Sequence, residues 1–224
     1  DTPLVEPKKE FTLLKRLLKY DYIVVSSEQG KKIFLKLFSN TNIHPKLKVS
    51  RYLKLNYFLK KIKVKHRNDC SKILIAPTNF RSFPKLSIQK KLAKIINVLL
   101  KLKFEVIYRP HPSNFFEKNV LAINVKYKKF KNFTFDQSND YTKSFESSDI
   151  IITDMSGTAY TYVVLNSKPV IFFNSEKEIK KFGYDQLNYF KYRSQVGYTV
   201  NSTKGIVKVL NIKKIQLKKD NKIK

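Results

Sequence analysis

Apolar residues along this chain gather in short runs of strand length, and longer segments of helical spacing lie between them. The strand-like runs span residues 21–26, 46–50, 72–76, 104–108, 133–135, 149–153, 168–173 and 197–200. Strands that alternate with helices at this rhythm favour βαβ units and therefore a parallel sheet. The pattern predicts an α/β fold with a Rossmann-like parallel sheet and helices on both of its faces.

Helical signals fill the segments between these runs. The predicted helices span residues 11–20, 28–38, 52–61, 84–103, 139–147, 156–165 and 203–210, with a short one after the capping-box spacing of Ser175 and Glu178. The longest, 84–103, places Leu92, Ile96 and Leu99 on one face. Two prolines at 110 and 112 then break the pattern, and no element is predicted from there to residue 133.

A charged stretch without periodicity, residues 63–69, separates two parts of the chain. We predict a first domain over residues 1–66, a second domain with the regular strand–helix pattern over 67–211, and a basic tail over 212–224. The length of 224 residues fits one domain plus part of another.

Polar side chains follow three of the predicted strands where each strand ends. In an open parallel sheet, ligands bind outside the carboxyl ends of the strands. The residues concerned are Thr78, Asn79 and Arg81 after the strand 72–76, Arg109 and His111 after 104–108, and Asp154, Ser156, Gly157 and Thr158 after 149–153. Cations, an imidazole and a hydroxyl-rich turn that opens a helix suit a diphosphate.

His111 is the candidate catalytic residue, because it lies at a strand end between two prolines that restrict the backbone. A neutral imidazole can act as a base, and a protonated one can hold a diphosphate. The alternative is a structural loop histidine that makes one hydrogen bond. For Arg109 the alternative is a surface ion pair, for Asp154 or Ser156 an ordinary helix cap, and for the residues after strand 72–76 a polar loop.

The formal net charge is +29, from 46 Lys and Arg against 17 Asp and Glu. Its functional interpretation is attraction to phosphate, as nucleic acid, anionic lipid or a nucleotide sugar. The alternative is the base composition of an AT-rich genome, to which we attribute most of the charge. A single cysteine, Cys70, excludes an internal disulfide, and no apolar run reaches the roughly 18–20 residues of a membrane span.

The motifs RPHP at 109–112 and SDIIITDMSGTAYTYVVLNSKPVIFF at 148–173 resemble the CDP-glycerol glycerophosphotransferase family of teichoic-acid and capsule polymerases. In the family's "ITDYSS" pattern, Met155 stands for the Tyr and Gly157 for the second Ser. DYIVVS at 21–26 with KKIF at 31–34, and IAPTNFR at 75–81, are similar to the family's "WDYLVSP…IF" and "YAPTWR". The similarity covers most of residues 1–200.

The resemblance implies a GT-B fold, with this chain as the C-terminal half plus part of the N-terminal domain. It implies a transferase in which an acceptor hydroxyl attacks the β-phosphorus of CDP-glycerol and CMP leaves. His111 would be catalytic, and the donor would be held by Arg109, Arg81, Thr78, Asn79, Asp154, Ser156, Gly157 and Thr158. No DxD motif occurs, so we expect a reaction without metal or cofactor, in which basic side chains and helix N-termini stabilise the leaving group.

The expected partners are a nucleotide-activated donor and a lipid-linked or polymer acceptor, in the cytoplasm. Peripheral binding at the inner face of the cell membrane is a further hypothesis, since basic helices at 8–19 and 54–65 suit anionic head groups. A solvated basic face is the alternative. The opening residues DTPL resemble the end of the family's "HGTPLK" motif, which implies that the motif's His lies just upstream of Asp1 and that the general base lies outside this chain.

Other functions stay open at this point. Because Met155 and Gly157 depart from the family pattern at the donor turn, another CDP-polyol or a nucleotide sugar is an alternative donor. A basic RNA-binding module is a second class, although the sequence has no RNP, KH or helix-turn-helix signature. A nucleotide-binding remnant or partner subunit without activity is the third.

Overall fold

The computed structural model describes residues 14–50, 57–60, 70–174, 176–181, 185 and 188–211. The chain divides into two compact units, residues 1–61 and 62–224. The predicted boundary after residue 66 and the predicted tail at 212–224 lie outside the described residues and stay predictions.

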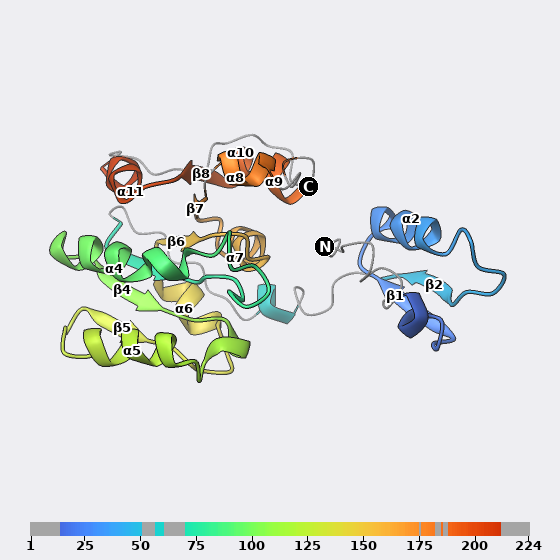
Figure 1. Cartoon of the computed structure of the whole chain (residues 1–224), viewed down its shortest axis with the longest axis horizontal. Coiled ribbons are helices and arrows are strands. Elements are labelled where there is room, and N and C mark those ends of the chain that lie inside the picture. The colour runs from blue at the N-terminus through green and yellow to red at the C-terminus, as the bar shows by residue number, and fades with distance from the viewer. Residues whose placement is uncertain are drawn as a thin grey trace. The chain divides into compact units, whose positions relative to one another are not determined.

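The smaller unit contains a two-stranded parallel sheet and a helix between its strands. β1 (Tyr22–Val25) pairs with β2 (Lys46–Val49), and α2 (Glu28–Leu37) connects them (Figure 1). The Ser27 hydroxyl accepts a hydrogen bond from Gly30 N at 3.0 Å and so caps α2. These three predicted elements are confirmed. The helices predicted at 11–20 and 52–61 fall partly outside the described residues, of which 14–17 and 57–60 are helical.

The larger unit is built on a parallel sheet of six strands in the order β5-β4-β3-β6-β7-β8 (Figure 1). The strands are β3 (Lys72–Ile75), β4 (Glu105–Tyr108), β5 (Phe133–Phe135), β6 (Ile150–Thr153), β7 (Val170–Phe173) and β8 (Gly197–Val200). Counted from β3, this is the 3-2-1-4-5-6 order of doubly wound nucleotide-binding folds, in which successive strands are added first toward one side of the sheet and, from the fourth strand on, toward the other. The reversal here lies between β3 and β6, which pair directly.

Helices cover both faces of this sheet. α4 (Leu92–Lys101), α5 (Lys118–Tyr127) and α11 (Thr203–Leu210) share one apolar core with alternate strand residues such as Ile73 and Ile75. Leu74 lies between those two and therefore points to the opposite face. α6 (Thr142–Ser147) and α7 (Thr158–Asn166) pack there, with the Phe145 and Tyr162 rings edge to face at 5.2 Å. The predicted parallel sheet with helices on both faces is confirmed.

The structure adds the helix α5, which the sequence pattern did not predict. Val120 and Tyr127 are buried and Ile123 packs against the same core, but Leu121 and Val125 are exposed, so apolar residues also lie outside the buried face of this helix. Glu117 precedes α5 without a side-chain cap bond. The exposed apolar residues obscure the helical period in the sequence, and no side-chain cap marks the start of the helix.

The helix predicted from residue 84 begins later. Turns occupy residues 84–86, and a 3₁₀ turn, η1 (Ile88–Lys91), follows Ser87 and leads into α4. The N–H of Ile88 is held by the Asp154 carboxylate at 2.9 Å, which fixes where the helical segment starts. Short helical turns complete the unit: η2 (Pro112–Asn114), α8 (Glu176–Lys181), α9 (Asn188–Lys191) and α10 (Arg193–Val196).

Candidate functional site

The reversal between β3 and β6 brings the predicted site residues to one edge of the sheet. β3, β4 and β6 are parallel neighbours, so the loops that follow them all leave at the carboxyl edge. Backbone hydrogen bonds continue past the strands, from Ala76 N to Ile152 O at 3.0 Å and from Arg109 N to Ile75 O at 2.9 Å. The three loops therefore start at the same level, in the crevice where this fold binds ligands.

Asp154 joins two of these loops through its buried carboxylate. Oδ1 accepts hydrogen bonds from Thr78 N at 2.8 Å and from Met155 N at 2.7 Å, and Oδ2 accepts one from Ile88 N at 2.9 Å. The side chain is 0% exposed. Burial raises the pKa of Asp154, while the three backbone donors act in the opposite direction. The carboxylate thus holds the loop after β3 against the turn after β6, and its predicted contact with a donor stays a prediction.

The turn after β6 presents hydroxyls at the start of α7. The Ser156 hydroxyl donates to Thr158 Oγ1 at 2.8 Å and accepts from Thr158 N at 3.3 Å. The Ser156 carbonyl accepts from the Tyr189 hydroxyl at 2.9 Å. In a trans peptide the N–H points opposite to the C=O, so the N–H of Gly157 points away from Tyr189. It has no partner among the described residues, and Gly157 is exposed. An unpaired N–H beside hydroxyls at a helix start is suited to a phosphate.

His111 lies at the start of η2 and caps that turn. Its Nδ1 accepts a hydrogen bond from Ser113 N at 3.2 Å. Since Nδ1 is the acceptor, the proton of the neutral ring is on Nε2. Burial lowers the pKa of His111 below its ordinary value, which favours this neutral form at pH 7. His111 therefore offers one N–H donor at Nε2, for which the described residues provide no partner.

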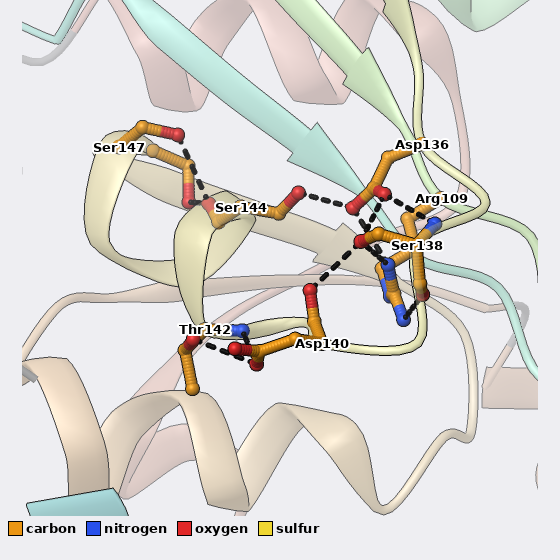
Figure 2. A network of polar contacts seen from close by, with 8 residues as sticks. Arg109, Asp136, Ser138, Asp140, Thr142, Ser144 and Ser147 are labelled. Atoms are coloured by element: carbon orange, nitrogen blue, oxygen red, sulfur yellow. Dashed lines mark hydrogen bonds and ion pairs between the residues drawn. The ribbon is translucent and has the colours of Figure 1, made fainter. Parts of the chain in front are cut away.

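Arg109 lies in a compact polar network at the end of β4 (Figure 2). Its Nη1 donates to Asp136 Oδ2 at 2.7 Å and to Ser138 Oγ at 3.1 Å, and Nη2 donates to the Ser138 carbonyl at 2.7 Å. Asp136 also accepts from the Ser144 hydroxyl of α6. The Arg109 side chain is 8% exposed, so in this structure its charge is balanced by Asp136. Its predicted contact with a diphosphate stays a prediction.

The loops after β3 and β4 are also joined to each other. Phe80 N donates to Asn114 Oδ1 at 3.3 Å, and Arg81 forms an ion pair with Glu117. Asn114 is 1% exposed. Asn79 accepts from Arg81 N at 3.0 Å through its side-chain oxygen. The predicted residues Thr78, Asn79 and Arg81 thus belong to one braced set of loops with His111 and Asp154.

Two contributors at this edge, Tyr189 and Arg193, were missed by the sequence analysis. Arg193 is 3% exposed and donates to the Asp154 carbonyl at 2.5 Å and to Asn174 Oδ1 at 2.6 Å. Its guanidinium lies 4.2 to 4.7 Å from the centroids of three aromatic rings, those of Phe190, Phe172 and Tyr189. The aromatic and basic run 189–193 was the signal available in the sequence, but it does not show which turn it contacts.

The described residues contain neither a clustered metal site nor a membrane-spanning helix. In the part of the chain that the structure describes, no group of three or more His, Cys, Asp or Glu side chains is placed to hold a metal ion. The expectation of a metal-independent reaction stays a prediction. Across the same described residues, no helix combines the length and apolar character needed to cross a bilayer. The basic segments proposed for membrane binding lie largely outside those residues.

The doubly wound parallel sheet with braced loops at its reversal point places the larger unit among the nucleotide-binding α/β folds, the class to which the domains of GT-B transferases belong. A family model described as CDP-Glycerol:Poly(glycerophosphate) glycerophosphotransferase matches residues 4–224, and the chain belongs to this family. The resemblance seen in the sequence motifs is confirmed. A search of curated protein sequences finds no match.

Solved structures similar to this chain include the wall teichoic acid polymerase TagF. A TagF variant with CDPG superposes with a TM-score of 0.59 at 20% identity, over 96% of this chain and 54% of that one. Another TagF structure gives 0.55 at 20% identity, over 96% and 53%. These likenesses show the fold and confirm the GT-B prediction. The chain spans about half the length of these polymerase structures.

Proposed function

We propose that this chain is the donor-binding part of a transferase that moves glycerophosphate from CDP-glycerol to a poly(glycerophosphate) acceptor. Family membership supports the reaction class. The observation that carries the proposal is the N–H of Gly157, which has no partner among the described residues, beside the Ser156 and Thr158 hydroxyls at the reversal point of a doubly wound sheet. This turn would receive the donor diphosphate.

In the proposed reaction, the acceptor hydroxyl oxygen forms a bond to the β-phosphorus of CDP-glycerol. The bond between that phosphorus and the bridging oxygen breaks, and CMP leaves with the electron pair. The hydroxyl proton passes to a base that we do not assign to a described residue. Such transfers depend mainly on positioning and on stabilisation of charge.

His111 would supply part of that stabilisation. Its Nε2–H would donate to a diphosphate oxygen, while Nδ1 stays bonded to Ser113 N. In this arrangement the neutral ring is a hydrogen-bond donor rather than a base. Arg109 and Asp154 would act through the loops that they hold, because both are buried against protein partners.

The proposal extends to a lipid-linked acceptor, to wall or capsule polymers and to peripheral association at the inner membrane face, as the resemblance in the sequence motifs implies. CDP-glycerol is proposed as the donor because the description of the family names it. Met155 is 7% exposed, so its replacement of the family's Tyr changes the interior of the turn more than its surface.

Calorimetric titration with CDP-glycerol, CMP and UDP tests the proposal. We expect binding of the cytidine nucleotides, with UDP weaker. His111→Asn keeps an oxygen that can accept from Ser113 N but removes the ring donor, so donor affinity should fall about tenfold, or about 1.4 kcal/mol. Arg109→Ala should abolish binding, because the loop after β4 loses the contacts with Asp136 and Ser138 that hold it in place. Wild-type protein that binds no cytidine nucleotide, or a His111→Asn variant that binds CDP-glycerol normally, would contradict it.

A further inference from the structure

A groove of about 580 Å³ opens at the carboxyl end of β7, on the same edge of the sheet as the donor turn. Its walls come from residues 84–91, from the end of β7 and from α8. The volume falls in the range of ligand sites, about 300–1,000 Å³. None of the residues predicted from the sequence to bind the donor lines it.

The groove is strongly positive. Four lysines line it, Lys85, Lys90, Lys91 and Lys181, against one carboxylate, Glu178. Three of them come from residues 84–91 and the fourth from α8, so positive charge lies on two opposing segments of the groove wall rather than along one helix face. The lysine ammonium is a point charge on a flexible side chain, without the planar, two-pronged geometry of the arginine guanidinium. It therefore suits phosphates whose spacing and orientation vary, as along a polymer.

The floor of the groove is held in place. The Asn174 side chain, 4% exposed, donates to the Leu86 carbonyl at 3.1 Å and accepts from Arg193 at 2.6 Å. The Lys91 ammonium lies over the Phe173 ring, 5.3 Å from its centroid. These contacts shape the groove before any ligand arrives, which reduces the ordering cost of binding.

The groove is connected directly to the donor turn. Ile88 lines it, and the N–H of Ile88 donates to Asp154 Oδ2 at 2.9 Å. Arg193 bonds both Asn174 in the groove and the Asp154 carbonyl in the turn. The groove and the turn that would hold the donor are therefore adjacent on one sheet edge and share the residues that position them.

We infer that this groove binds the phosphodiester backbone of the polymer acceptor. The inference rests on the proposed function, because the transfer requires a polyanionic chain beside the donor. The groove is open and lined by single point charges, as suits a chain with one negative charge per repeat. Free inorganic phosphate offers the same chemistry, and nucleic acid offers a related backbone, so the test separates these ligands.

The test compares two double variants of equal charge change. Lys90→Glu with Lys181→Glu alters the groove, and Lys101→Glu with Lys128→Glu alters exposed lysines that do not line it. A fluorescent glycerol phosphate oligomer is titrated at fixed salt and followed by anisotropy. We expect at least a tenfold loss of affinity in the groove variant and less than a twofold loss in the control. Equal losses would overturn the inference, since they would report only net charge.

Competition identifies the ligand. An RNA oligomer of equal charge and inorganic phosphate should each displace the labelled oligomer at least tenfold less well than unlabelled oligomer. If RNA competes equally, the groove binds nucleic acid; if phosphate does, it binds isolated phosphate. Either result overturns the acceptor assignment. Thermal unfolding of each variant confirms that it is folded. If the variant with Lys90→Glu and Lys181→Glu does not fold, the variant with Lys90→Gln and Lys181→Gln replaces it.

Titration of the groove variant with CDP-glycerol separates this inference from the proposed function. Donor affinity should stay within twofold of wild type, because the turn is intact. Groove-dependent oligomer binding in a protein that binds no CDP-glycerol would contradict the proposed function and leave the groove as a polyanion site. Normal donor binding with groove-independent oligomer binding would contradict only the inference.

Discussion

Asp136 was not among the predicted site residues, yet its carboxylate accepts hydrogen bonds from three residues. Its two carboxylate oxygens accept from Arg109, from the backbone and hydroxyl of Ser138, and from Ser144 (Figure 2). Burial alone would raise the pKa of Asp136, but the hydrogen bonds from Ser138 and Ser144 and the Arg109 guanidinium outweigh it and lower the pKa. The ionised carboxylate is thus the form that fits the site.

Asp136→Asn should therefore destabilise the larger unit at neutral pH. The change leaves the Arg109 guanidinium buried without its counter-charge, and breaking a buried pair in this way costs about 3 kcal/mol. Chemical denaturation measures the loss. The control is Glu105→Gln, which breaks a more exposed pair with Lys72 and should cost less than about 1 kcal/mol. Equal losses from the two variants would contradict the account.

The same pair sets a pH dependence. Because the folded pKa of Asp136 lies below its unfolded value of about 3.9, its contribution is present above that value. It is lost as the pH falls through the folded pKa. The unfolding free energy of wild type should drop more steeply below about pH 4 than that of Asp136→Asn.

At the scale of elements, α9 and α10 contact the turn after β6 through the backbone carbonyls of that turn. Tyr189 donates to the Ser156 carbonyl and Arg193 to the Asp154 carbonyl. Both bonds orient peptide groups whose opposite sides carry the N–H groups of the turn. Tyr189 and Arg193 are thus positioning residues for the proposed site.

Tyr189→Phe should weaken CDP-glycerol binding about fivefold, as expected for loss of one hydrogen bond worth about 1 kcal/mol. Arg193→Lys keeps the charge but cannot serve both acceptors with a planar fork, so it should weaken binding further. Tyr192→Phe, at an exposed position, is the matched control. Calorimetry on the three folded variants measures their affinity for CDP-glycerol. Equal affinity in Tyr189→Phe and Tyr192→Phe would show that the Tyr189 hydrogen bond does not position the turn.

The sequence predicted elements better than contacts between them. The β-branched runs at β3, β4, β6 and β7 and the Ser27 cap were readable because they depend on neighbours in the chain. The helix α5 was not, because its exposed Leu121 and Val125 obscure the helical spacing of its buried residues. The sequence pattern predicted the strand β8, but not the short helical turns α9 and α10 that precede it.

The candidate site shows the same limit. The strand-end rule placed Thr78, His111 and Asp154 on one edge. It did not identify Asp136, which meets Arg109 across 27 positions, or Arg193, which meets Asp154 across 39. Such partners follow from the order of strands and from loop packing, which no local pattern encodes.

At the scale of the whole molecule, all the site residues predicted from the sequence lie in the larger unit. There the donor turn at β6 and the lysine-lined groove at β7 share one edge of one sheet. The net charge of +29 gives a general attraction for phosphate. We propose two specific places on that edge, one for the diphosphate and one for the polymer.

A crystal structure of the protein soaked with CDP-glycerol tests this most directly. We predict diphosphate oxygens about 3 Å from Gly157 N, from the hydroxyl of Ser156 or Thr158 and from His111 Nε2. A donor whose diphosphate lies instead among the lysines of the β7 groove, or away from the β6 turn altogether, would contradict the central claim.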